Sequence, residues 1–99
     1  TNIARSSVLK ECGVYRMWYS TLRSPFYSYR IGYAESSNCL SWTRKDNTVG
    51  IDVSASGFDN EMICYPSVVS YGGTLYMFYN GNGYGREGIG LAIAENNKL

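Results

Sequence analysis

Short runs rich in Tyr, Val, Met and Trp, bounded by glycines and other turn residues, recur along the chain, which is the pattern of β-strands joined by tight turns. The clearest segment is "VYRMWYS" at residues 14–20, and "TLYMFYN" at residues 74–80 repeats its character sixty positions later. Both segments place large apolar side chains on both faces of the strand. A strand that is apolar on both faces is normally covered from both sides, so we expect packing layers on either side of each.

Turn residues divide the chain into seven predicted strands. In the first half these are residues 4–10, 14–21, 28–36 and 40–45, which predict a four-stranded meander. In the second half they are residues 64–71, 74–80 and 87–94. The second half therefore lacks a fourth strand or borrows one, and residues 1–6 are the candidate donor, within the chain or from a neighbour.

An internal repeat is the second signal in the sequence. Residues 4–20 align with residues 64–80 at an offset of sixty, and after a two-residue gap "IGYAES" falls on "IGLAIA". A period of this size is typical of propellers. We predict an all-β, β-propeller-like fold in which residues 1–99 form a single unit of two four-stranded antiparallel blades, at about 4–46 and 60–99. A small sandwich or barrel is the alternative.

Composition limits the function. The 99 residues are 44% hydrophobic and 15% aromatic, with a formal net charge of +1 and no histidine. The lack of histidine excludes an imidazole base and a His-ligated zinc site. The basic residues are scattered, and no apolar run approaches the ~20 residues of a membrane helix. We therefore expect no nucleic-acid partner, no membrane partner, no metal and no cofactor.

The three cysteines, Cys12, Cys39 and Cys64, lie far apart and form no C-x-x-C pair. This spacing argues against a metal cage, and the odd number leaves at least one thiol free. We interpret them as small buried apolar residues in a reducing compartment, and hence expect a cytoplasmic protein.

Five segments resemble the five-bladed β-propeller glycoside hydrolases of the arabinanase, xylosidase and fructosidase type. They are "YRMWYS", "YRIGYAESSNCLSWTR", "FDNEMICYPSVV", "LYMFYNGNGYG" and "GIGLAIAE". The resemblance covers about residues 3–95. It implies a funnel at the propeller axis, where carboxylates from several blades converge on one sugar. Since only two blades are present, the catalytic set in this chain would be incomplete.

Glu61 is the candidate catalytic acid, because the resemblance implies a proton-donating glutamate in "FDNEMICYP". Its neighbours Phe58, Met62 and Tyr65 would desolvate the carboxyl group and keep it protonated. A solvated loop glutamate is the alternative. Asp59 is interpreted as a turn residue rather than a second carboxylate, and Asp52 as a cap on its own backbone.

Arg5 and Tyr65 are candidate sugar-binding residues on the first strand of each half. The resemblance implies an arginine facing the funnel at the position of Arg5, where its planar guanidinium can bind hydroxyl groups. Tyr65 stands sixty positions later. A surface arginine is the alternative. The aromatic residues of "FYSYR" at residues 26–30 are interpreted as packing rather than function.

The loop "YNGNGYGREG" at residues 79–88 supplies three further candidate sugar-binding residues, Asn82, Tyr84 and Arg86. A sugar can stack its C–H bonds on an aromatic ring while amide and guanidinium groups bind its hydroxyls. A flexible hairpin tip without function is the alternative.

These observations predict a glycoside-hydrolase-like propeller portion that acts on or binds carbohydrate. The alternative is a non-catalytic, self-assembling sugar-binding module, or a structural protein without activity. Two blades alone would expose apolar faces and an unpaired strand edge. We therefore expect a homo-oligomer, or the missing blades of a larger protein, to cover them.

Overall fold

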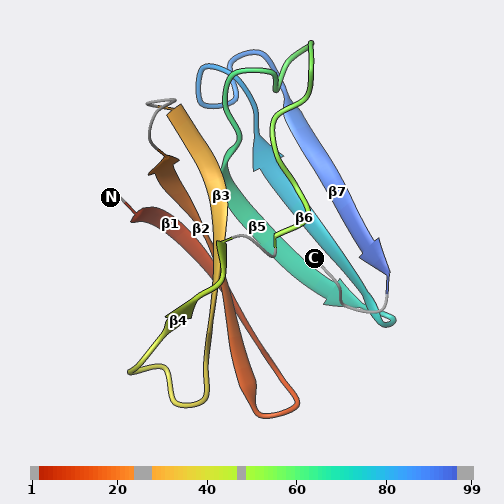
Figure 1. Ribbon diagram of the computed structural model, residues 1–99. Coiled ribbons are helices and arrows are strands. Elements are labelled where there is room, and N and C mark those ends of the chain that lie inside the picture. The colour runs from red at the N-terminus through yellow and green to blue at the C-terminus, as the bar shows by residue number, and fades with distance from the viewer. Residues whose placement is uncertain (1–2, 24–27, 47–48, 96–99) are drawn as a thin grey trace.

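The computed structural model describes residues 3–23, 28–46 and 49–95, which fold into two antiparallel sheets (Figure 1). The first sheet has the order β1-β2-β3-β4, from β1 (Ile3–Glu11), β2 (Val14–Arg23), β3 (Ser28–Ser36) and β4 (Thr43–Arg44). The second has the order β5-β6-β7, from β5 (Cys64–Tyr71), β6 (Thr74–Asn80) and β7 (Ile89–Glu95). The fold is all-β and propeller-like, as predicted, and the two sheets do not close into a ring.

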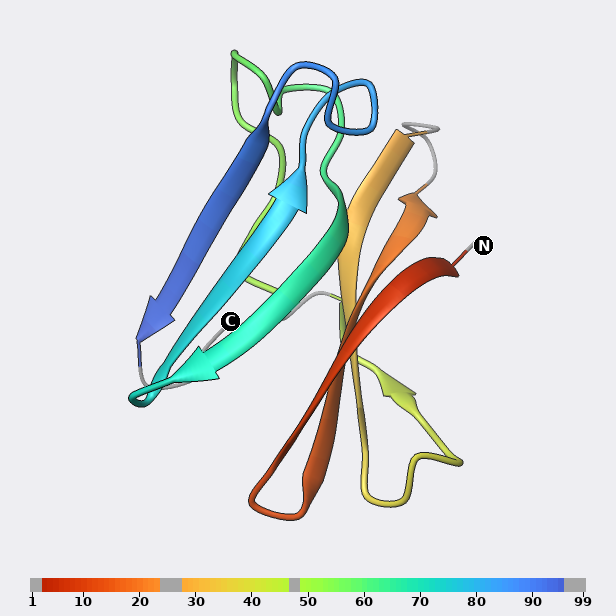
Figure 2. The ribbon, with the colours of Figure 1, turned by 180° about the vertical axis from the view of Figure 1, so that it is seen from behind.

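The sheets fan apart from their inner strands, as the blades of a propeller do (Figure 2). β1 and β5 are edge strands of their sheets and contact each other, and we call them the inner strands. Within the described residues the second sheet has three strands, as expected. Ile3 and Ala4 pair with Thr21 and Ser20 of β2, so the start of β1 belongs to the first sheet. Residues 3–4 therefore do not supply the missing strand, and residues 1–2 lie outside the described chain.

The fourth strand is shorter than predicted, covering Thr43–Arg44 instead of residues 40–45. Side chains before it bind the backbone that a longer strand would need. Ser36 Oγ accepts a hydrogen bond from the Cys39 N–H at 2.9 Å, and Asn38 Oδ1 accepts from the Leu40 N–H at 2.8 Å. Such local side-chain bonds compete with pairing in a sheet and delay the start of β4.

The core lies between the sheets. Trp18 and Tyr33 from the first sheet pack with Leu75 and Met77 from the second, and Ile63 of the connecting segment completes the cluster. All five are at most 3% exposed. The expectation that both faces of the apolar strands are covered holds for β2, where Trp18 and Tyr19 point to opposite faces and both are fully buried. It fails for β6, where Met77 is buried but Phe78 is 47% exposed.

The hairpin turns of the two sheets have the same backbone form. Cys12 and Gly13 have φ of 50° and 80°, and Gly72 and Gly73 have φ of 59° and 81°. Two successive positive values are characteristic of a type I′ turn. Cys12 thus stands where its counterpart is glycine.

The expectation of buried cysteines holds only for Cys64, whose burial raises its thiol pKa to about 11. All three cysteines are free, but Cys12 and Cys39 are exposed, Cys12 in a hairpin turn and Cys39 in a bend. The described residues form no helix that could span a lipid bilayer.

Candidate functional site

Each inner strand contains a β-bulge near its start. The register of β1 shifts between Ala4 and Ser7, and that of β5 shifts between Cys64 and Ser67. Within these bulges Arg5 has a φ of 45° and Tyr65 a φ of 54°. Non-glycine residues rarely adopt positive φ, and bulges re-aim side chains next to functional sites. The matching irregularities therefore mark this end of the inner strands as a candidate site.

Two serines of the first sheet fix the bulge of β5. Ser20 Oγ accepts a hydrogen bond from the Tyr65 N–H at 2.6 Å, and Ser7 Oγ accepts one from the Val68 N–H at 3.0 Å. The bulge would otherwise leave backbone donors without partners. These two bonds hold β5 against β2 and β1, close to where Arg5 and Tyr65 emerge.

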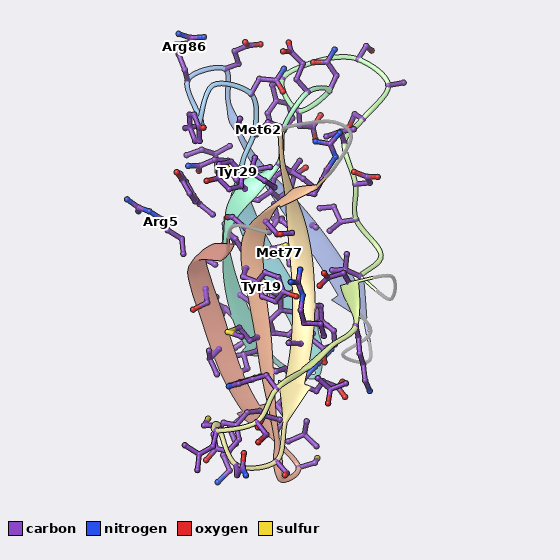
Figure 3. The ribbon with its side chains drawn as sticks, turned by 60° about the vertical axis from the view of Figure 1, so that its left-hand side comes forward. Arg5, Tyr19, Tyr29, Met62, Met77 and Arg86 are labelled. Atoms are coloured by element: carbon purple, nitrogen blue, oxygen red, sulfur yellow. The ribbon has the colours of Figure 1, made fainter. Side chains whose placement is uncertain are left out.

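Arg5, Tyr29, Tyr65 and Tyr84 form a group that we call the Arg-Tyr cluster. The Tyr65 and Tyr84 rings stack with centroids 5.8 Å apart, and Tyr29 lies 5.9 Å from Tyr84 and 6.3 Å from Tyr65. The Arg5 guanidinium lies over Tyr65, 4.7 Å from the ring centroid. Figure 3 shows Arg5 projecting from β1 away from the sheets, with Tyr29 between it and the loop that follows β6.

The surroundings of Tyr65 raise the pKa of its hydroxyl group. Partial desolvation raises its pKa, the neighbouring Cys64, Tyr29 and Tyr84 add to this rise, and the positive charge of Arg5 opposes it. Like a tyrosine with the usual pKa of about 10, Tyr65 is neutral at physiological pH, and its hydroxyl can donate a hydrogen bond.

Tyr84 is presented by an ordered turn rather than by a loose hairpin tip. The loop closes through a hydrogen bond from the Gly81 N–H to the Gly88 carbonyl at 3.0 Å, and Asn80 Nδ2 donates to the Tyr84 carbonyl at 3.2 Å. Tyr84 has a φ of 58° between two glycines that also have positive φ. Its ring is 52% exposed although it touches two other tyrosines. The loop therefore offers an aromatic face to solvent.

Asn82 lies beneath this loop, where it is 3% exposed. Its Oδ1 accepts hydrogen bonds from the backbone N–H groups of Glu61 and Met62 at 2.8 and 3.0 Å. Its Nδ2 donates to Asn60 Oδ1 at 2.7 Å. The amide thus joins the loop to the segment before β5. This geometry favours a positioning role for Asn82, while direct sugar binding by it stays a prediction.

Glu61 lies near the Arg-Tyr cluster but is exposed. Its carbonyl accepts a hydrogen bond from Arg30 Nη1 at 3.0 Å, and the Ile63 N–H donates to the Tyr29 carbonyl at 3.2 Å. The ring of Phe58 stacks on Tyr79, and the apolar shielding expected around the Glu61 carboxyl group stays a prediction. Catalysis by Glu61 stays a prediction.

Arg86 is exposed at the tip of the loop and points away from Arg5 and Tyr29 (Figure 3). Of the expected sugar-binding residues, the structure brings together Arg5, Tyr65 and Tyr84. It adds Tyr29, which the sequence analysis interprets as packing. The antiparallel order of the strands could have placed Tyr29 near Arg5, because the start of β3 must lie at the same end of the sheet as the start of β1.

The aspartates have structural partners. Asp59 is buried in a turn, where its Oδ2 accepts a hydrogen bond from the Tyr79 hydroxyl at 2.9 Å. Asp52 Oδ1 accepts from the Val53 N–H at 2.8 Å and pairs with Arg30 Nε at 2.9 Å. Both agree with the sequence interpretation. The described residues contain no group of three His, Cys, Asp or Glu side chains placed to hold a metal ion.

Comparisons with known proteins place the chain in a fold group. No protein-family model matches it. It is 44% identical over 92 residues to an uncharacterized protein of Mycobacterium tuberculosis, a match that covers 93% of this chain and 30% of that protein. The corresponding protein of a second strain matches equally. The chain therefore spans about 30% of the length of these curated relatives.

Solved structures give the architecture. A glycosyl hydrolase from Bacteroides ovatus matches 99% of this chain and 30% of its own, with a TM-score of 0.75 and 16% identity. A structure from the family of mannoside phosphorylases, which contains glycoside hydrolases that target β-1,2-mannosidic linkages in Candida mannan, covers the same shares with a TM-score of 0.72 and 16% identity. An exo-1,5-α-L-arabinanase from a bovine ruminal metagenomic library matches 93% of this chain and 30% of its own, with a TM-score of 0.64 and 18% identity. The chain has the fold of a two-blade portion of a propeller-type glycoside hydrolase.

Proposed function

We propose that this chain supplies a carbohydrate-binding surface in a glycoside-hydrolase-like propeller, with the Arg-Tyr cluster as its platform. The observation that supports this most is the pair of bulges, which direct Arg5 and Tyr65 from different blades to one place. Positive φ at two non-glycine residues costs backbone strain, and such bulges often lie next to active sites, which supports a functional site at this end of the inner strands.

The chemistry of the cluster suits a neutral sugar. Tyr84 offers an exposed ring on which the C–H bonds of a pyranose or furanose can stack. The Arg5 guanidinium has several N–H donors, and its position over Tyr65 places them close to the tyrosine rings. Arg5 and the tyrosine hydroxyls can therefore bind sugar hydroxyls around a ring lying on Tyr84.

Titration calorimetry with arabino-, xylo-, fructo- and manno-oligosaccharides tests this proposal. We expect one of these series to bind, and Tyr65→Ala or Tyr84→Ala to weaken binding about tenfold, the loss of roughly one aromatic contact. Tyr71→Ala is the matched control, because Tyr71 also belongs to β5 but is 77% exposed and lies outside the cluster. Equal affinities for Tyr65→Ala and Tyr71→Ala would refute the platform.

Bond cleavage requires a second proposal, in which Glu61 donates a proton to the leaving sugar. Glycosidases use two carboxyl groups, about 5–5.5 Å apart in retaining enzymes and about 6.5–9.5 Å apart in inverting ones. Because Asp52 and Asp59 are engaged by Arg30 and Tyr79, the second carboxylate would come from outside this chain. Hydrolysis of aryl glycosides that survives Glu61→Gln would remove Glu61 from this role. Sugar binding should be the same in the wild type and in the Glu61→Gln variant.

A non-catalytic, self-assembling sugar-binding module is the second candidate function. It is favoured by the exposed apolar face of the second sheet, where Phe78 and Leu91 are 47% and 48% exposed. Sugar binding by a chain that also forms an oligomer in light scattering would support this candidate, since neither candidate requires hydrolysis by this chain alone.

A further inference from the structure

Arg30 of β3 is buried next to the Arg-Tyr cluster, although its side chain is charged. It directly follows Tyr29 in the sequence, and its side chain is only 8% exposed. A guanidinium that leaves water is stable only where its N–H groups find partners. The partners of Arg30 therefore indicate what its burial achieves.

The Arg30 guanidinium joins three segments of the chain. Its Nη1 donates hydrogen bonds to the Tyr29 carbonyl at 3.1 Å and to the Glu61 carbonyl at 3.0 Å. Its Nε pairs with Asp52 Oδ1 at 2.9 Å, and the same oxygen accepts a hydrogen bond from the Val53 N–H at 2.8 Å. Two of the three segments thus carry residues of the candidate site, Tyr29 of the cluster and the candidate acid Glu61.

The second sheet has the same strand pairing without an arginine at this position. Gly32 and Gly90 are counterparts, because each pairs with the tyrosine of the central strand whose ring covers it. Two residues before them stand Arg30 and Gly88. A Cβ at Gly88 would lie 2.9 Å from the Phe58 ring, which fills the place of a side chain there. Strand pairing in a blade therefore does not require an arginine here, which favours a role at the candidate site.

Arg30 acts on the direction of the Tyr29 ring through the backbone. The Tyr29 carbonyl accepts hydrogen bonds from Arg30 Nη1 and from the Ile63 N–H at 3.2 Å, and these fix the backbone at the start of β3. The Tyr29 ring meets Tyr84 edge to face, at an interplanar angle of 68°. Such a contact depends on the direction of both rings. A backbone change at Tyr29 would therefore alter the cluster.

We propose that Arg30 is a positioning residue of the sugar site, whose buried guanidinium sets Tyr29 within the Arg-Tyr cluster and holds the Glu61 segment beside β3. Asp52 orients the guanidinium from the solvent side, since its own side chain is 64% exposed. The inference rests on the proposed carbohydrate site. It adds a residue that acts on the ligand through Tyr29 and Glu61 rather than by touching it.

Nuclear magnetic resonance of the ligand-free chain tests the positioning. In Arg30→Met we expect the nuclear Overhauser effect between the Tyr29 and Tyr84 rings to be lost, while that between Tyr65 and Tyr84 remains. The carbonyl carbon resonance of Glu61 should shift in the same variant, because the carbonyl loses its hydrogen bond from Arg30.

Arg16→Met is the matched control. Arg16 lies in the same sheet, its side chain is 12% exposed, and it pairs with Glu11 at 3.3 Å, but its guanidinium lies over Trp18 rather than in the cluster. This variant should lose stability and keep the Tyr29–Tyr84 effect. Asp52→Ala removes a largely solvated partner, so it should stay folded and weaken the Tyr29–Tyr84 effect even if Arg30→Met does not fold.

Titration calorimetry with the same oligosaccharide panel separates this inference from the proposed function. Arg30→Met should weaken binding about fivefold, since the contact of one aromatic ring is lost, and Arg16→Met should leave the affinity unchanged. A wild type that binds no sugar would refute the proposed function, whereas loss of the Tyr29–Tyr84 effect in Arg30→Met would still show that Arg30 sets the cluster.

Two results would overturn the inference even if the wild type binds sugar. One is a Tyr29–Tyr84 effect that is unchanged in both Arg30→Met and Asp52→Ala. The other is loss of this effect in Arg16→Met as well, because the change would then follow stability rather than the contacts of Arg30.

Discussion

β2 and β6 have closely similar sequences but lie in different surroundings. Trp18 of β2 is fully buried, whereas Phe78, at the corresponding register position of β6, is 47% exposed. Ile31 beside Trp18 is 1% exposed, and Ile89 beside Phe78 is 69% exposed. The difference shows that a strand apolar on both faces indicates a need for two partners, but not which partner is present.

The tyrosines of the two blades also reach the same environment by different routes. Tyr19 lies over Gly32 and donates to Asp46, which follows β4. Tyr79 lies over Gly90 and donates to Asp59, which precedes β5. Burial, and then these hydrogen bonds to carboxylates, raise the pKa of both tyrosines to about 12. Both blades bury a tyrosine hydroxyl that needs a hydrogen-bond acceptor. The acceptor is an aspartate after the last strand of the first sheet and before the first strand of the second sheet.

The largest expected effect comes from truncating the two counterpart aromatics. Trp18→Ala should lower the free energy of unfolding by about 3–5 kcal/mol, because it opens a cavity between the sheets. Phe78→Ala should cost about 1 kcal/mol in the monomer, since half of its ring is already in water. Urea denaturation at high dilution measures both values. Equal losses would contradict the assignment of one covered and one open face.

A smaller effect is expected at the glycines beneath the tyrosine rings. A Cβ at Gly32 would overlap the Tyr19 ring, so Gly32→Ala should cost about 2–3 kcal/mol through overpacking. Gly50→Ala is the control, because a Cβ at Gly50 would meet no atom within 4 Å. The two variants should differ clearly in thermal midpoint, and a Gly32 variant as stable as the Gly50 variant would exclude the close ring contact.

The raised tyrosine pKa values predict a loss of stability in alkali. A pKa of about 10 in the unfolded chain and about 12 in the folded one stabilises the fold fully below pH 10, and this contribution disappears as the pH rises toward 12. Tyr79→Phe should cost about 1.5–3 kcal/mol at pH 7 by removing a bond to a charged acceptor, and should lose less stability than wild type between these pH values. Parallel pH profiles for the two proteins would contradict the proposed bond.

Asp46 predicts the opposite pH dependence. Burial raises its pKa, but hydrogen bonds from the Tyr19 hydroxyl, the Tyr33 N–H and Arg44 outweigh burial and hold the pKa below its usual value. The stability from these bonds is present above about pH 4 and is lost as the pH falls further. Asp46→Asn should therefore flatten the acid side of the stability profile, and an unchanged acid limb in denaturation curves would refute it.

The smallest effect is expected at the first hairpin turn. Cys12 has a φ of 50°, whereas its counterpart in the second turn is Gly72 at 59°. Cys12→Gly should raise the free energy of unfolding by about 1 kcal/mol by relieving backbone strain. Cys39→Gly, in a loop that also has positive φ, offers a second test of the same reasoning. A decrease in stability for Cys12→Gly would show that the turn tolerates a side chain without strain.

Sequence patterns predict the strand order well, because alternation and turn residues act locally. They do not reveal the bulges at Arg5 and Tyr65, since a bulge depends on the register between two strands. Tyr29 reaches the Arg-Tyr cluster because β3 pairs with β2 in a particular register. The residues next to Tyr29 in the sequence do not indicate this position. The backbone of Glu61 is held by Asn82, twenty-one residues later, and the residues around Glu61 in the sequence give no sign of this contact. Contacts between residues far apart in the sequence thus decide the features of the site that the sequence patterns do not predict.

The most direct test of the carbohydrate proposal is an NMR titration of the tyrosine ring resonances with the oligosaccharide panel. We predict saturable shifts in the rings of Tyr29, Tyr65 and Tyr84, while Tyr71 and Tyr15 remain unchanged. Shifts confined to Tyr71 and Tyr15, or no saturable shift with any of the four sugar series, would contradict the proposal that the paired bulges build a sugar platform.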